Sequence, residues 1–179
     1  MKTEKQPLPT LCEMETAVAK LWDVRRHVIV PNISWGMKLH ECDLLILTKA
    51  NYAIEVEIKR SKADLKKDVE KAHAHQSKRI KELWFAIPEQ LKNCLDLIPE
   101  HAGIIIVKKR KLKSLKVEYR AVRKRLPVTN KEAIKLTEAE VSNLKRLGCM
   151  RIWSLKATIL NLQQELQQIK EERILLEVS

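Results

Sequence analysis

The sequence contains little glycine, and this scarcity narrows the folds open to it. Only three glycines occur among its 179 residues. A glycine-rich phosphate-binding loop and a turn-dense all-β fold are therefore both disfavoured. Apolar residues make up 45% of the chain, which is enough to fill the core of one domain and leave an appendage.

Closely spaced cysteines are also missing. The four cysteines, at positions 12, 42, 94 and 149, are far apart, and none forms a Cys-x-x-Cys pair. A structural zinc site is therefore not expected. Reduced cysteines in a cytoplasmic protein are the simplest interpretation.

Long apolar runs are absent as well. The first residues, MKTEKQPLP, contain no apolar segment of the kind found in a signal peptide. No stretch approaches the roughly 20 apolar residues that span a membrane. We therefore expect a soluble protein with no membrane partner.

Positive charge is abundant and unevenly placed. The formal net charge is +12, and the segment from Lys108 to Arg125 holds ten basic residues against one acid, Glu118. Such a density suits a polyanion, because each phosphate that is neutralised releases condensed counterions. A solvated, highly charged loop or strand pair is an equally ordinary interpretation of a basic segment taken alone.

Apolar periodicity and turn residues predict helices alternating with strands. Helices are expected at 11–22, from Ser61 through Lys81 with an interruption near 73–77, and at 90–97. Strands are expected at 28–30, 44–47, 52–59, 83–87, 103–107 and, at an edge, 115–122. The short connection at 49–51 implies that the strands on either side of it are antiparallel. The order α-β-β-β-α-β, then αβ, predicts a mixed α/β sheet flanked by helices.

After Pro127 the pattern becomes helical, so we divide the chain into domain 1–127 and a C-terminal helical segment, 128–179. One helix is expected over 130–147, and a second after Gly148. Apolar residues then recur three and four apart, as in a coiled coil: Ile152, Leu155, Ile159, Leu162, Leu166 and Ile169. The seam predicts either a homodimer through this helix or a helix packed on its own domain.

The strand from Glu55 to Lys59 could carry chemistry. Alternate side chains on a strand share a face, so Glu55, Glu57 and Lys59 point one way. A charged face of an antiparallel strand is ordinarily exposed to solvent. However, Asp43 lies across a short hairpin and can share a hard divalent ion with Glu57 if the two occupy one face. Two acids and a lysine are a minimal set for cleaving a phosphodiester, with Mg²⁺ or Mn²⁺ activating water and Lys59 stabilising charge.

These pieces resemble the PD-(D/E)XK nuclease superfamily. The resemblance rests on Glu-Cys-Asp at 41–43, Glu-Ile-Lys at 57–59, an acidic helix before them and a helix beginning at Ser61 after them. It covers about residues 11–107, and the run HECDLLIL…YAIEVEIKRSKADLKKD is similar to small phage and bacterial members. Cys42 stands where the family name implies proline. The resemblance implies a restriction-endonuclease-like core with a C-terminal helical or coiled-coil extension.

The resemblance also implies roles for individual residues. Asp43 and Glu57 would bind the metal together with the backbone carbonyl of Ile58, and Lys59 would be the catalytic lysine. The superfamily often adds an acid from its first helix. Glu13 and Glu15 are both candidates, and Glu15 is better placed to face the sheet. Glu55 could replace Glu57 if the strand register slipped.

Basic and polar residues of the helix after this motif and of the basic segment 108–125 are candidates for binding the substrate: Lys62, His75, Gln76, Lys108, Lys109, Arg110 and Lys111. The function predicted is a metal-dependent nuclease acting on nucleic acid, most simply DNA, in repair, restriction or a mobile element. The alternative is a non-catalytic nucleic-acid-binding or scaffolding subunit with the same fold.

Overall fold

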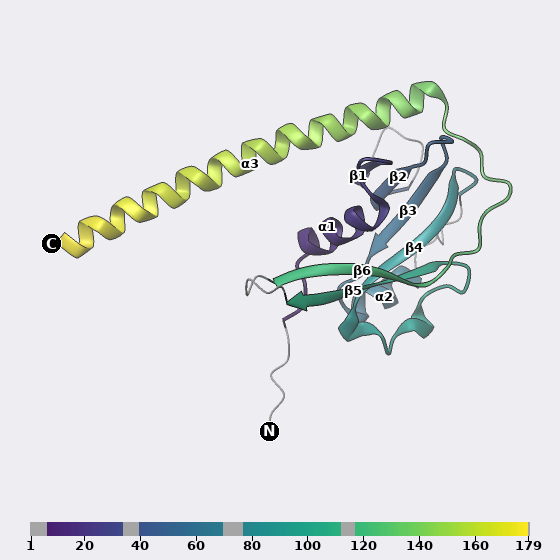
Figure 1. Cartoon of the computed structure of the whole chain (residues 1–179), viewed down its shortest axis with the longest axis horizontal. Helices are drawn as coiled ribbons and strands as arrows, with labels where there is room; N and C mark the ends of the chain where they lie inside the picture. The colour runs from purple at the N-terminus through teal and green to yellow at the C-terminus, as the bar shows by residue number, and fades with distance from the viewer. Residues whose placement is uncertain (1–6, 34–39, 70–76, 112–116, 179) are drawn as a thin grey trace.

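The computed structural model describes residues 7–33, 40–69, 77–111 and 117–178. They form a mixed α/β structure with one long C-terminal helix (Figure 1). The elements, in chain order, are α1 (Leu11–Trp22), β1 (Val28–Ile33), β2 (Cys42–Leu47), β3 (Ala53–Ile58), α2 (Lys62–Val69), β4 (Ile80–Pro88), the 3₁₀ turns η1 (Glu89–Leu91) and η2 (Leu95–Leu97), β5 (Gly103–Lys111), β6 (Val117–Arg125) and α3 (Glu138–Val178).

The six strands form one sheet in the order of the chain, β1-β2-β3-β4-β5-β6. The pairs β1–β2, β2–β3 and β5–β6 are antiparallel, whereas β3–β4 and β4–β5 are parallel. The predicted mixed sheet and the antiparallel pairing across 49–51 are therefore confirmed. Because β3, β4 and β5 run in the same direction, their carboxyl ends lie at the same end of the sheet.

Both faces of the sheet are covered. On one face, α1 packs Met14, Val18 and Trp22 against Ile54, Val56 and Ile58 of β3 and against neighbouring strands. A capping box fixes the start of α1: Thr10 Oγ1 accepts the Glu13 N–H at 3.2 Å, and Glu13 Oε2 accepts the Thr10 N–H at 2.7 Å.

The opposite face carries two apolar clusters. The first joins β1 and β2 to Leu136, Leu144 and Leu147, which come from α3 and the segment before it. The second joins β4 and β5 to Leu65 of α2 and to the 3₁₀ turns. Helices therefore cover this face at two separate places.

The prediction of a helix over 130–147 was wrong at its start. Residues 128–136 contain a turn at 131–132 and no helix, because their backbone amides donate to segments beside the sheet: Val128 to the His101 carbonyl at 2.8 Å and Leu136 to the Asn51 carbonyl at 2.8 Å. The helix begins only at Glu138, after a second capping box between Thr137 and Glu140.

The expected break at Gly148 does not occur, since α3 runs from Glu138 to Val178 without interruption. Gly148 lies close to β1 within this helix: a Cβ at this position would lie 3.3 Å from Val30 Cγ2. Beyond the domain boundary expected at 127, Leu136, Leu144 and Leu147 pack in the apolar cluster of β1 and β2.

Two shorter elements also differ from prediction. The helix after Ser61 was expected to reach Lys81, but β4 already begins at Ile80, whose buried side chain packs beside Ala53. The helix expected over 90–97 consists of the two 3₁₀ turns. Among the described residues, no helix is both long and apolar enough to cross a membrane.

Candidate active site

Three alternate charged positions along β3 and its end face the protein interior. Glu55 is 0% exposed, Glu57 2% and Lys59, directly after the strand, 7%. An ordinary solvated face is thus excluded for these residues. They lie on the face opposite α1, and their neighbours on the adjoining strands, Leu45 and Phe85, are buried and apolar. Charges in such surroundings require partners, since burying an unpaired charge is strongly unfavourable.

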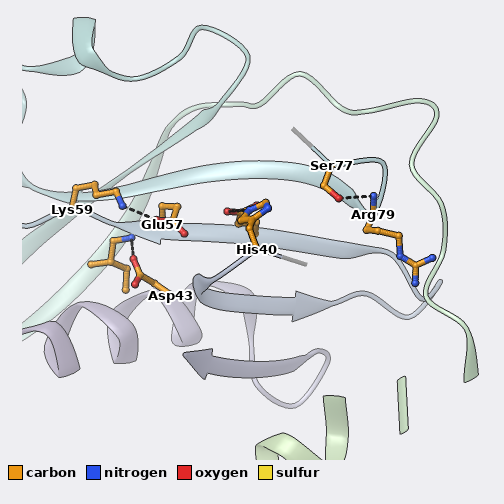
Figure 2. Close-up of polar contacts among 8 residues, drawn as sticks. His40, Asp43, Glu57, Lys59, Ser77 and Arg79 are labelled. Atoms are coloured by element: carbon orange, nitrogen blue, oxygen red, sulfur yellow. Dashed lines mark hydrogen bonds and ion pairs between the residues drawn. The ribbon is translucent and has the colours of Figure 1, made fainter. Parts of the chain in front are cut away.

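Glu57 and Lys59 partner each other. Lys59 Nζ donates to Glu57 Oε2 at 2.6 Å (Figure 2). Burial raises the pKa of Glu57 above its usual value, Lys59 opposes this rise, and the nearby carboxylate of Asp43 adds to it. The lysine therefore stabilises a carboxylate that its surroundings would otherwise tend to protonate.

Asp43 lies where the β2–β3 ladder stops. The last paired residues are Leu44 and Val56, and one step further the Ile58 N–H donates to Asp43 Oδ2 at 2.6 Å. The side chain of Asp43 thus replaces a ladder carbonyl and is fixed against the end of β3. Strand alternation is broken here, because Cys42 packs with the cluster of β1 and β2 whereas Leu44 packs under α1. Asp43 sits at this crossover between the two faces.

Glu15 of α1 approaches Asp43 from the other side. Burial raises the pKa of Glu15, and the charge of Asp43 raises it further. Its Oε1 is buried and accepts no hydrogen bond from the described residues. Glu13 is instead held in the capping box of α1. Of the two candidate acids from this helix, Glu15 is therefore the one that the fold brings to Asp43.

Glu55 has a separate partner that the sequence did not reveal. His40 Nε2 lies 2.8 Å from Glu55 Oε1, and the His40 side chain is only 13% exposed. In the β2–β3 register His40 lies several residues beyond the last paired position, so hairpin pairing alone would not align it with Glu55. The adjacency of His40 to Glu41, Cys42 and Asp43 is the only sequence signal for it.

Cys42 is buried close to the carboxylates of Glu55 and Glu57. Burial, with the charges of Glu55 and Glu57 next, raises the pKa of its thiol well above the usual range. The thiol is therefore neutral at physiological pH and behaves as a small apolar group.

The candidate substrate-binding residues divide into three groups. Lys62 is the exposed first residue of α2, three positions after Lys59. Lys108, Lys109, Arg110 and Lys111 form the final part of β5, where Lys108 and Arg110 are exposed and Lys109 is half-buried. His75 and Gln76 lie outside the described residues.

The basic end of β5 and the acidic cluster lie at the same end of the sheet. Ile58 pairs with Ala86 of β4, Ala86 pairs with Ile105 of β5, and β5 then continues to Lys111. Figure 2 likewise shows Asp43, Glu57 and Lys59 together at the tip of β3, with Arg79 at the opposite end. A phosphate chain lying across this end can therefore meet carboxylates, a lysine and basic side chains within one region.

A metal would meet hard oxygen donors here. Asp43, Glu57 and Glu15 are carboxylates, the class of ligand that Mg²⁺ and Mn²⁺ prefer. The buried Oε1 of Glu15 and the closeness of Asp43 to both glutamates fit a cation in chemical terms. In the described part of the chain, however, no three His, Cys, Asp or Glu side chains are grouped so that they could hold one ion.

Comparison with known proteins adds a likeness of fold. No protein-family profile and no curated protein matches the chain. A solved structure that does match is the SPO1766 protein of unknown function from Silicibacter pomeroyi, with a TM-score of 0.56 and 18% identity over 88% of this chain and 93% of that one. At that identity the likeness concerns the fold alone. By its fold, the chain is a mixed α/β protein with a six-stranded mixed sheet and a long C-terminal helix.

Proposed function

We propose that this chain is a metal-dependent nuclease that hydrolyses phosphodiester bonds, with DNA as the substrate. The observation that carries the proposal is the buried Glu57–Lys59 ion pair beside Asp43, at the sheet end where the basic part of β5 emerges. A buried ion pair seldom stabilises a fold more than apolar packing does, so its presence at this position supports a role in chemistry rather than in stability.

Asp43 and Glu57 would hold Mg²⁺ or Mn²⁺, with the carbonyl of Ile58 as a further ligand. Glu15 would join them only after the three carboxylates close around the ion, because they do not form a ready group of three in this structure. When bound, such an ion supplies an activated water and neutralises charge on the phosphate. The side chains of the protein position the substrate and stabilise the charge that develops during cleavage. Lys59, on the same face as Glu57, turns its ammonium to the scissile phosphate or to the attacking water and stabilises the charge that develops there.

The same geometry supports a mode of substrate binding. Lys108 and Arg110 are exposed at the end of β5, and Lys62 is exposed at the start of α2. These side chains lie at the sheet end that carries Asp43 and Lys59, so they would grip the phosphates on either side of the bond to be cut. Contacts of this kind bind the backbone and carry no sequence specificity.

A plasmid-nicking assay tests the proposal. Purified protein is incubated with supercoiled DNA and Mg²⁺ or Mn²⁺, with EDTA as the metal-free control. We expect nicking or linearisation with either metal, loss of at least about 100-fold in Glu57→Gln, and a similar loss in Lys59→Met, the size typical of removing an electrostatic catalytic group. Intact plasmid under all metal conditions would contradict nuclease action on duplex DNA.

Glu55→Gln is the matched control for Glu57→Gln. Glu55 is on the same strand, points to the same face and is at least as buried, but it pairs with His40. It should keep activity close to that of the wild type. Thermal melting of all three variants separates loss of chemistry from loss of fold. Equal losses in Glu55→Gln and Glu57→Gln, at unchanged stability, would exclude the assigned site.

The alternative is a binding or scaffolding subunit without catalysis. It is favoured by the existing Glu57–Lys59 contact of 2.6 Å and by the lack of a ready group of three metal-binding side chains among the described residues. Under this alternative, salt-sensitive binding of DNA persists and Glu57→Gln leaves every measurable function intact, although the loss of the buried partner of Lys59 lowers stability.

A further inference from the structure

The second half of α3 presents an apolar seam to solvent. From Ile152 onward every described side chain of the helix is exposed. The seam consists of six residues, each 51–60% exposed: Ile152, Leu155, Ile159, Leu162, Leu166 and Ile169. Figure 1 shows this part of α3 running past the sheet and away from it. Packing on its own domain, one of the two possibilities left open by the sequence, therefore does not account for the seam.

The first turns of α3 pack on the sheet, and the exposed seam begins after them. Leu144 and Leu147 are buried against β1 and β2, and Arg151 donates to the Asn32 carbonyl at 2.7 Å. Gly148 lies against Val30. The seam thus starts one turn after the helix leaves its own sheet. An exposed apolar stripe of this length is stabilised in water by a partner helix.

We propose that a second copy of this chain covers the seam, and that the two helices pair antiparallel. In an antiparallel pair, each a position packs in one layer with a d position of the other helix. One register matches every seam residue with another: Ile152 with the second copy's Ile169, Leu155 with its Leu166, and Ile159 with its Leu162. The arrangement is symmetric, so both copies use the same surface.

Charges beside the seam favour the antiparallel direction. In this register Arg151 faces the second copy's Glu172, which pairs opposite charges at both ends of the seam. Arg173, which interrupts the apolar pattern, falls outside the matched segment. A parallel pair would instead place Arg151 near the second copy's Lys156 and bring the two Arg173 side chains together in one layer of the seam. Both contacts join like charges. The parallel pair would gain only one kind of favourable contact, between Glu165 and the second copy's Lys170.

A partner helix of another protein is less well supported. The six apolar residues are complete as a self-complementary set, and their flanking charges complement one another under the same two-fold symmetry. No further chain is needed to satisfy them. The pairing is independent of nuclease activity, because none of its residues belongs to the cluster around Asp43.

Light scattering coupled to size exclusion, with sedimentation equilibrium, tests the pairing in the full-length chain. We expect a dimer at micromolar concentration. Leu162→Glu places a charge in the central layer and should give a monomer. Gln164→Glu adds the same charge on the outer face of the helix and should stay dimeric. A monomeric wild-type protein, or a dimer that is unaffected by Leu162→Glu, would overturn the proposal.

Disulfide trapping tests the direction. In a Cys12→Ser, Cys94→Ser, Cys149→Ser background, we expect Leu155→Cys mixed with Leu166→Cys to give a cross-linked heterodimer on mild oxidation. Neither variant alone should cross-link efficiently, because the two copies of each residue lie several turns apart. Efficient cross-linking of each single variant would show a parallel pair and overturn the antiparallel assignment. The melting temperature of the globular part should be unchanged throughout, since these residues do not touch it.

Discussion

Asp43 is the residue on which the candidate site is centred. It closes the end of the β2–β3 ladder by accepting the Ile58 N–H at 2.6 Å, and it lies close enough to Glu15 and Glu57 to raise the pKa of both. A single carboxylate thereby links the helix on one face of the sheet to the ion pair on the other. Its replacement would alter backbone geometry and electrostatics together, so its neighbours are better probes.

Glu15→Gln should stabilise the protein at neutral pH. Folding raises the pKa of Glu15 above 4.5, so the folded state holds the proton more tightly than the unfolded chain does. The associated stability is present below that pH and is lost as pH rises through the raised pKa. Removing the charge should therefore raise the melting temperature measured at pH 7.

The same variant distinguishes stability from metal binding. The gain in Tm should disappear near pH 4, where the wild-type side chain is also neutral. If Glu15 is a metal ligand, Mg²⁺ or Mn²⁺ should raise the Tm of the wild type more than that of Glu15→Gln. A lower Tm for the variant at pH 7 would show that the Glu15 carboxylate is stabilising, against the direction of its pKa shift.

At the scale of elements, packing between β4 and β5 leaves no room at Gly103. A Cβ there would lie 2.4 Å from Trp84 Cε3, and Trp84 itself packs edge-on against Trp22 with ring centroids 5.4 Å apart. The indole cannot withdraw without disturbing α1. Gly103→Ala should therefore destabilise the protein by about 1–3 kcal/mol, the usual result of overpacking, measured by denaturant unfolding.

Gly148→Ala is the matched control for Gly103→Ala. A Cβ at position 148 would lie 3.3 Å from Val30 Cγ2, a contact that a few tenths of an ångström would relieve. Alanine also favours a helix interior by about 1 kcal/mol over glycine. The net change in the free energy of unfolding should be small. A loss as large as that of Gly103→Ala would mean that the α3–β1 contact is tighter than its distances indicate.

For the whole molecule, the asymmetry of charge predicts how nucleic acid binds. Lys108→Ala combined with Arg110→Ala removes two exposed charges at the sheet end that carries Asp43. The dependence of log affinity on log salt should become shallower by about 0.9 for each phosphate that the protein no longer neutralises. Fluorescence anisotropy with a short duplex at several salt concentrations measures this slope.

A charge-matched control comes from elsewhere on the surface. Lys131→Ala combined with Lys145→Ala removes the same charge from exposed positions away from the end of β5. Only a minor change in affinity and slope is expected. If both double variants lose affinity equally, net charge rather than the basic end of β5 governs binding.

The proposed pairing of α3 also bears on the whole molecule. The matched segment from Ile152 to Ile169 is about 27 Å long at 1.5 Å per residue. An antiparallel pair would therefore hold the two sheet domains at opposite ends of the paired helices. Two sites separated in this way suit simultaneous contact with distant points on a nucleic acid better than cleavage of both strands at one position.

The order of elements and the paired faces of β3 were predictable, because local patterns alone decide them. Alternation separated Glu55, Glu57 and Lys59 from Ile54, Val56 and Ile58, and the helix over 11–22 and the mixed sheet were confirmed. The non-helical segment 128–136 was not predictable, since its backbone amides donate to residues far away in the sequence that local propensity does not register.

Sequence alone determined which side chains share a face and which residues repeat with helical spacing. It did not determine what covers a face, because coverage depends on segments far apart in the chain. Tertiary structure alone buried the charged face of β3, brought Asp43 to the Ile58 N–H and His40 to Glu55, and left the seam of α3 exposed. The physical reason is that periodicity is a property of one element, whereas burial and charge pairing are properties of the elements packed against it.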